Sequence, residues 1–174
     1  TLNSIASLIV SRPETAEKAV EDLAELFRAS LKENHSRTTV DDELRLTSLY
    51  LGIEQLRLGD RLQVQWDVDD STREASMPSL ILQPLAENAV YHGIAGLPEG
   101  GCIRIQIFRH NDQVCASIEN PVPDTRSASA GNNMALNNVA QRLEATYGAG
   151  TRLETSSPAG HFRVELAYTP LQNS

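Results

Sequence analysis

The spacing of apolar residues first changes near Gly59, from a purely helical pattern to an alternating one, and this change limits the folds that the chain can adopt. Residues 2–58 carry apolar side chains at intervals of three and four, which is the period of a helix packed on one side. Residues 62–68 alternate apolar and polar side chains, which is the pattern of a half-buried strand. We therefore predict two parts, a helical segment over residues 1–58 and an α/β domain over residues 59–172.

The helical part divides at two breaks. Pro13 separates a first helix from a second, because proline restricts the residue before it and suits the first turn of a helix. A polar loop over residues 32–39 precedes a third helix, which is predicted to begin at Asp41 or Asp42 and to end at Gly59. The apolar stripes on these helices are narrow, so we expect the helices to pack against one another.

In the second part, strands are predicted to alternate with helices along the chain. The expected order is strand, helix, two strands, long loop, helix and two strands, over residues 62–68, 78–92, 102–108, 114–118, 119–133, 134–148, 152–155 and 162–168. If the first of these helices is an ordinary core helix, Pro78 and Ser79 are its expected N-terminal cap. Because strand pairs joined by short turns are antiparallel, we expect an antiparallel sheet with its helices on one face. This is a two-layer α/β sandwich.

One stretch, residues 80–93, combines an apolar run with polar side chains at helical spacing. Asn88 and His92 stand one turn apart, and Glu87 and Tyr91 form the neighbouring row. An acid, an amide and an imidazole at the edge of a buried helix are costly unless they contact each other, a ligand or a metal. The alternative is a core helix whose polar side chains simply reach solvent.

Composition argues against two kinds of partner. The chain carries 15 basic and 23 acidic residues, a net charge of -8, so it lacks the basic surface that binds nucleic acid or an anionic membrane. We expect no signal peptide, and no stretch approaches the roughly 20 apolar residues of a membrane span. Cys102 and Cys115 lack metal-ligand spacing and are predicted to be reduced core residues of a cytosolic protein. A small phosphorylated ligand remains compatible, since a metal ion and backbone N–H groups can neutralise its charge.

Two features of the second part favour a site for nucleotide phosphates. Asn88 offers an amide oxygen, which hard cations such as Mg²⁺ accept as a ligand. The helix that follows Asn132 and Asn133 offers free backbone N–H groups at its N-terminus. The irregular residues 119–133 lie between these features in the sequence and are expected to form a flexible cover over the pocket.

Longer motifs then identify a family. PLAENAVYHG and LNNVAQRLEATYG together resemble the ATP-binding domain of the LytS and AlgZ group of bacterial sensor histidine kinases, the AlgZ type most closely. YLGIEQLRLGDRL and MPSLILQPL are similar to connecting segments of that family, and Thr1-Leu2-Asn3 resembles the end of its phosphoacceptor motif. The resemblance implies an ATP-binding sandwich of the GHKL type, preceded by a helical dimerisation segment.

The resemblance also implies roles for individual residues. Asn88 is the implied Mg²⁺ ligand and, with Glu87 and His92, the implied catalytic group. Tyr91 and His92 would contact the phosphates of ATP or position water. Glu119 or Asn120 stands where the family has its adenine-contacting acid. The expected cofactors are ATP and Mg²⁺, and the remaining implied cofactor-binding residues are Gly131, Asn133, Ala135, Leu136 and Asn138.

As a member of this family, the chain is expected to be the catalytic part of a protein anchored in the bacterial inner membrane, on its cytoplasmic side. It would transfer the γ-phosphoryl group of ATP to a histidine upstream of residue 1, and onward to an aspartate of a LytTR-type response regulator. His35, His92, His110 and His161 lie outside the acceptor motif, so the fragment alone is not expected to phosphorylate itself. The intact protein is expected to be a homodimer.

Departures from the family pattern leave an alternative open. Pro121 stands where the family has a flexible glycine, and Ala135 stands within a glycine-rich box. A degenerate module that no longer catalyses, and serves as a dimerising or regulator-binding scaffold, would tolerate both. A third class, the GHKL chaperones and topoisomerases, activates water with a glutamate four residues before the metal-binding asparagine. This chain has Pro84 at that position, which disfavours hydrolysis by water.

Overall fold

The computed structural model describes residues 2–31, 38–123 and 131–171. Parts of the two predicted loops, residues 32–37 and 124–130, lie outside the described residues, and so does His35. The predicted cover over the pocket is therefore not described in its central part.

The chain opens with a helical hairpin, as predicted. Helix α1 (Leu2–Ser11) and helix α2 (Pro13–Leu31) meet at Arg12, and Pro13 occupies the first position of α2. Ile5 and Leu8 of α1 pack on Ala16 and Ala19 of α2, where the small alanine side chains allow the two helices to come close.

Helix α3 (Val40–Leu58) follows the two-residue strand β1 (Thr38–Thr39) and has two buried faces. The helix begins one residue earlier than predicted because Thr39 caps it, accepting a hydrogen bond from the backbone N–H of Asp42. It ends at Gly59, as predicted, where φ is +58°. The face that packs on the sheet core carries Val40, Leu44, Leu51 and Leu58. The opposite face places Leu46 and Ile53 against Leu26 of α2.

Five strands form the main sheet: β2 (Leu62–Val68), β4 (Gly101–His110), β5 (Gln113–Pro121), β7 (His161–Tyr168) and β6 (Arg152–Ser156), in that spatial order. The prediction of an all-antiparallel sheet was wrong at one position, because β2 pairs with β4 in parallel. The chain crosses over between them through a helix, a connection that parallel strands require. The other pairs are antiparallel, as predicted.

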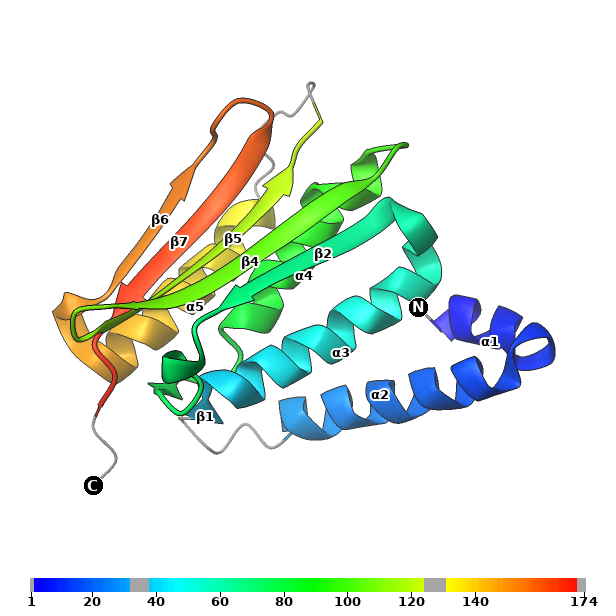
Figure 1. Cartoon of the computed structure of the whole chain (residues 1–174), viewed down its shortest axis with the longest axis horizontal. Coiled ribbons are helices and arrows are strands. Elements are labelled where there is room, and N and C mark those ends of the chain that lie inside the picture. The colour runs from blue at the N-terminus through cyan, green and yellow to red at the C-terminus, as the bar shows by residue number, and fades with distance from the viewer. Residues whose placement is uncertain (1, 32–37, 124–130, 172–174) are drawn as a thin grey trace.

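Helices α4 (Leu82–His92) and α5 (Gly131–Tyr147) cover one face of the sheet, which confirms the two-layer α/β architecture (Figure 1). Their buried faces join the strands in one core, which also contains the face of α3 described above. Figure 1 shows α3 running beside β2, with α2 beyond it. Short 3-10 turns over Gly59–Arg61, Asp70–Thr72, Ile94–Gly96 and Gly148–Gly150 join these elements.

Three predicted boundaries were wrong by a few residues. The helix predicted over residues 78–92 begins at Leu82, because Ser76–Met77 form strand β3, paired with β1, and the residues after it turn. Pro78 and Ser79 therefore do not cap it; the carboxylate of Glu43 binds the backbone N–H groups at its start. In the predicted loop over 119–133, β5 continues to Pro121 and α5 begins at Gly131.

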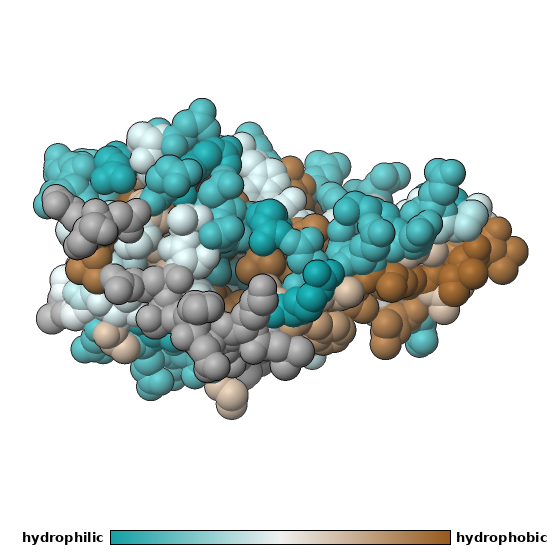
Figure 2. Space-filling view, turned by 90° about the horizontal axis from the view of Figure 1, so that it is seen from below, coloured by the Kyte–Doolittle hydropathy of each residue, from teal (hydrophilic) through white to brown (hydrophobic). Residues whose placement is uncertain are grey.

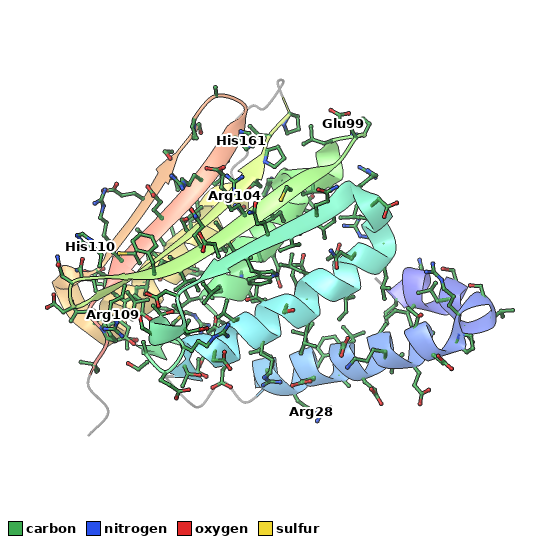
Figure 3. The ribbon with its side chains drawn as sticks, viewed as in Figure 1. Arg28, Glu99, Arg104, Arg109, His110 and His161 are labelled. Carbon is green, nitrogen blue, oxygen red and sulfur yellow. The ribbon has the colours of Figure 1, made fainter. Side chains whose placement is uncertain are left out.

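The other face of the sheet is open and polar. Arg104 of β4 forms an ion pair with Glu119 of β5, and Arg163 of β7 forms a second ion pair with the same carboxylate. Arg104 lies on the face of the sheet that is turned toward the viewer in Figure 3. Cross-strand pairs of opposite charge suit the solvated face of such a sheet.

Apolar surface gathers at the end of the molecule that α1 and α2 form (Figure 2). The exposed large apolar side chains of these two helices are Leu2, Ile9, Val10, Val20 and Phe27. None of the helices within the described part of the chain is long and apolar enough to cross a lipid bilayer.

Candidate functional site

A pocket of about 310 Å³ lies on the polar edge of α4. Its lining residues come from three helices and are Tyr50, Pro84, Glu87, Asn88, Tyr91, His92 and Ala135. The structure thus brings together four residues that the sequence placed on one helix face, and adds one residue each from α3 and α5.

Asn88 combines burial with access to the pocket. The residue is only 6% exposed, yet it lines the cavity. Its neighbour Glu87 is exposed and accepts a hydrogen bond of 2.9 Å from the side-chain nitrogen of Gln83. The rings of Tyr91 and His92 meet edge to face, with centroids 4.8 Å apart. One amide, one carboxylate and one imidazole thus border the same cavity.

This set of side chains fits a hard divalent cation held together with a ligand. Among the described residues, no three histidine, cysteine or acidic side chains gather as a metal site of their own. Mg²⁺ does not need such a cage, since it binds through one or two protein oxygens, substrate phosphates and several waters. The amide oxygen of Asn88 and the carboxylate of Glu87 are the amide and carboxylate oxygens among the described residues that line this pocket.

Tyr50 belongs to the pocket and was missed by the sequence analysis. Burial raises the pKa of its hydroxyl, and the nearby carboxylates of Glu54 and Glu87 raise it further, so the ring carries a neutral O–H donor beside Glu87. Tyr50 follows Leu46 by four positions on α3, a spacing that indicates packing between helices. No sequence signal separates this tyrosine from an ordinary core residue.

Asn120 lies beneath the C-terminal end of α4, close to the pocket but not among its lining residues. It is 2% exposed and points to the helix-covered face of the sheet, and its side-chain nitrogen donates to the carbonyl of Pro121 at 2.8 Å. A Cβ atom added to Gly93, the residue after α4, would lie 2.3 Å from that same nitrogen. The structure therefore places a predicted adenine-side residue directly against the end of the helix that carries Asn88.

The contact at Gly93 leads to a prediction about stability. A Cβ atom at residue 93 would also lie 2.6 Å from the carbonyl oxygen of Ala89 and 2.8 Å from that of Pro121, and backbone atoms cannot move cheaply. Gly93→Ala is expected to destabilise the fold by about 1–3 kcal/mol, as overpacked sites do. Gly52→Ala is the matched control, because no atom lies within 4 Å of its added Cβ and alanine favours a helix interior. Urea unfolding of both variants measures the difference, and equal stabilities would contradict the close contact.

The other predicted site residues are more dispersed. Glu119 lies on the open face of the sheet, opposite to Asn88, and is held by two arginines. Leu136 packs in the core, and Asn138 is exposed on α5. Gly131 and Asn133 lie in the first turn of α5, and the side chain of Asn133 lies outside the described part of the structure.

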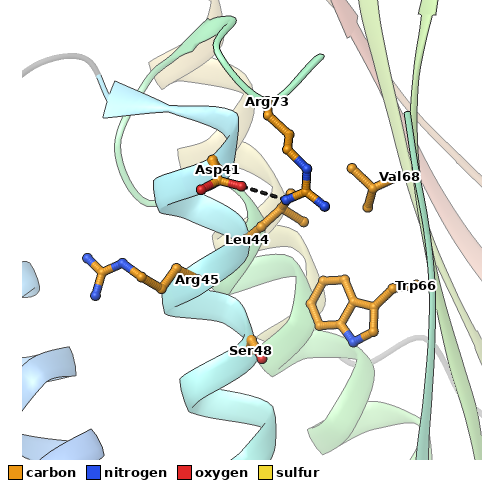
Figure 4. A pocket seen from close by; sticks show the side chains of 7 residues that line it. All are labelled: Asp41, Leu44, Arg45, Ser48, Trp66, Val68 and Arg73. Carbon is orange, nitrogen blue, oxygen red and sulfur yellow. Dashed lines mark hydrogen bonds and ion pairs between the residues drawn. The ribbon is translucent and has the colours of Figure 1, made fainter. Parts of the chain in front are cut away.

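A second cavity, of about 360 Å³, lies between α3 and β2 (Figure 4). Trp66 and Val68 form one wall, and Leu44 and Ser48 form the other. Arg73 closes one end through an ion pair of 2.5 Å with Asp41. The sequence analysis predicted none of these side chains as functional.

Histidine kinases resemble this chain in sequence and in fold. The histidine kinase family model matches residues 1–62. The sensor histidine kinase BtsS of Escherichia coli (strain K12) is 30% identical over 169 residues, which cover 95% of this chain and 30% of BtsS. The sensor protein LytS of Staphylococcus haemolyticus is 26% identical over 170 residues, which cover 90% of this chain and 29% of LytS. Over nearly its whole length the chain is similar to LytS-type sensor histidine kinases. It spans about 30% of the length of the curated relatives that it matches.

The chain also has the fold of solved histidine kinase domains. The catalytic domain of histidine kinase ThkA aligns with a TM-score of 0.56 at 13% identity, covering 77% of this chain and 95% of that domain. The predicted α/β class and the predicted resemblance to LytS-type sensor histidine kinases are thus confirmed, while the finer grouping with AlgZ stays a prediction.

Proposed function

We propose that this chain is the catalytic part of a sensor histidine kinase that binds ATP with Mg²⁺ and transfers the γ-phosphoryl group to a histidine upstream of residue 1. The observation that carries the proposal is the pocket in which Glu87, Asn88 and His92 of α4 border one cavity together with Ala135 of α5. A LytTR-type response regulator would receive the phosphoryl group next. The chain would lie on the cytoplasmic side of a protein anchored in the inner membrane.

In this proposal the residues of α4 bind and orient, and the chain supplies no covalent chemistry of its own. The amide oxygen of Asn88 would hold Mg²⁺, which neutralises phosphate charge when bound. Glu87 would accept a hydrogen bond from a metal-bound water, and His92 would donate to a phosphate oxygen. Pro84 stands one turn before Asn88 and has no carboxylate to activate water, so the phosphoryl group is retained for a protein acceptor.

The adenine side of the site is assigned to Asn120 in preference to Glu119. Asn120 faces α4, whereas the carboxylate of Glu119 is engaged by arginines on the opposite face of the sheet. Gly131, Asn133 and Ala135 are proposed to surround the phosphates through the start of α5, and Leu136 and Asn138 are proposed to support this part of the helix.

The helical segment over residues 1–58 is proposed to mediate dimerisation and phosphotransfer. The exposed apolar side chains of α1 and α2 form the kind of surface that another helix pair would cover. The ATP-binding domain over residues 59–172 is proposed to share α3 with this segment, since α3 has one face in each core. We expect a homodimer of the intact protein.

A calorimetric titration with ATP and with a non-hydrolysable analogue, each with and without Mg²⁺, tests the proposal. We expect Mg²⁺ to tighten the binding of both nucleotides by about tenfold or more, since Asn88 would hold the metal and the metal would neutralise phosphate charge. No label from γ-labelled ATP should appear on the chain itself. Equal affinity with and without Mg²⁺ would remove the support for Asn88 as a metal ligand.

One observation favours a second candidate function. Ala135 lines the pocket where the family has a glycine-rich box, and the amide of Asn120 already binds the carbonyl of Pro121. A non-catalytic module that dimerises or binds a regulator would keep the helical surface without binding nucleotide. If calorimetry detects no nucleotide binding and sedimentation shows that the chain is a dimer, the non-catalytic function is favoured.

A further inference from the structure

The turn before α4 has an unusual backbone. Leu80 adopts a left-handed conformation with φ of +58°, which leucine avoids because its Cβ crowds the following carbonyl. Ile81 then adopts a right-handed conformation with φ of -101° and ψ of -54°. Successive left- and right-handed residues turn their N–H groups to the same side and form a concave site for an anion.

The anion in this site is an internal side chain. The carboxylate of Glu43 accepts hydrogen bonds from the backbone N–H groups of Leu80, Ile81 and Leu82, at 2.7, 2.8 and 2.9 Å. Glu43 belongs to α3 and is only 1% exposed. Burial raises the pKa of Glu43, and the three N–H groups act in the opposite direction by stabilising the carboxylate. The start of α4 is therefore held by a side chain from another helix.

A contact from α5 holds the same turn. The Arg142 guanidinium donates to the carbonyl of Ser79 at 3.1 Å, and its charge also stabilises the carboxylate of Glu43. Residues 79–82 are thus bound by side chains from the helices on both sides of α4.

Helix α3 therefore contacts α4 at two places. Glu43 binds its first turn, and Tyr50, two helical turns further along α3, lines the pocket beside Asn88. The opposite face of α3 packs against α2 through Leu46 and Ile53. A shift of the α2–α3 pair would move the Glu43 carboxylate, and the start of α4 with it.

We propose that Glu43 is a positioning residue that couples the helical segment to the nucleotide site by fixing the turn at Leu80 and hence the position of Asn88. The predicted effect on ATP binding rests on the proposed function. The predicted effect on the backbone turn at Leu80 does not. Glu43 touches neither nucleotide nor metal in this scheme and acts only through α4.

The first test measures the turn itself by hydrogen exchange. In the wild-type chain, the amides of Leu80, Ile81 and Leu82 should exchange as slowly as the core amides of α4. Glu43→Gln replaces one of the two accepting oxygens by an NH₂ group, so at least one of the three backbone N–H groups loses its acceptor and should exchange about tenfold faster or more. Glu74→Gln is the matched control, since it makes the same chemical change at an exposed glutamate in the preceding turn. Fast exchange in the wild-type chain would overturn the proposal without any variant.

The second test separates positioning from simple loss of stability. At a temperature where all variants are folded, Glu43→Gln should weaken binding of ATP with Mg²⁺ by about tenfold and leave Mg²⁺-free binding nearly unchanged. Leu80→Gly accepts the left-handed conformation without strain, and adding it to Glu43→Gln should restore part of the Mg²⁺ effect. An unchanged Mg²⁺ effect in Glu43→Gln would overturn the coupling. Absence of nucleotide binding in the wild-type chain would instead refute the proposed function, and the exchange experiment would still decide the role of Glu43.

Discussion

A fragment that begins at Gly59 is expected to remain unfolded, whereas a fragment that begins at Thr38 is expected to fold. The difference between them is β1 and α3, which a division of the chain at residue 58 assigns to the helical segment. Helix α3 places Val40, Leu44, Leu51 and Leu58 in the core of the sheet domain. The shorter fragment would expose the apolar surface that these side chains cover.

The free energy of unfolding that the shorter fragment would lose is close to the total free energy of unfolding of a typical domain. Burying one such side chain contributes about 1.5–3 kcal/mol, so the four together contribute roughly 6–12 kcal/mol. Domains are stable by only about 5–15 kcal/mol in total. The short fragment would also leave the N–H groups of residues 80–82 without the carboxylate of Glu43. Circular dichroism and amide dispersion in NMR spectra would show which fragment folds, and a folded Gly59 fragment would contradict the assignment of α3 to the sheet core.

Replacing Asn88 by alanine is expected to abolish the effect of Mg²⁺ on nucleotide binding while the chain stays folded. Removing a residue that only hydrogen-bonds to a metal ligand typically weakens metal binding about 10–100-fold. Removing the ligand itself should therefore weaken binding of ATP with Mg²⁺ by more than about 100-fold. The fold should survive because the amide borders the pocket and leaves space that water can fill. Calorimetry with ATP and Mg²⁺ measures the affinity, and thermal unfolding checks the fold.

Asn137→Ala provides the control for this variant. Asn137 is exposed on α5 and is not among the residues that line the pocket, so its loss should change the affinity for ATP less than twofold. If the Asn88 and Asn137 variants bind ATP with Mg²⁺ equally tightly, Asn88 is not the metal ligand.

Periodicity predicted most of the fold because helices and strands expose one face each to the core. The three opening helices, the five strands of the main sheet and the two covering helices all follow apolar spacings that the sequence displays. Parallel pairing of β2 with β4 could not be predicted, since it depends on the path of residues 69–100 across the sheet and not on the strands themselves.

The site was predictable to the extent that it lies on one helix. Asn88 and His92 share a face of α4 by spacing alone, and the pocket includes both. Glu43 was not predictable as a ligand of a distant turn, because it follows Asp41 and Asp42 and resembles an ordinary acid in the first turn of a helix. Tyr50 has the spacing of a packing residue, and its place beside Glu87 depends on how α3 meets α4.

The parallel pairing of β2 with β4 also bears on the order in which the sheet assembles. The hairpins β4–β5 and β6–β7 join strands across a few residues, so little chain entropy opposes their closure. Strand β2 reaches its partner only after 32 intervening residues, from 69 to 100, have folded back through α4. Contacts so distant in sequence form slowly, and they become favourable once the crossover helix covers the sheet. The pairing of β5 with β7 joins residues at least as distant in sequence, so both pairings are expected to form after the two hairpins. The helix that carries Asn88 acquires its final neighbours only then.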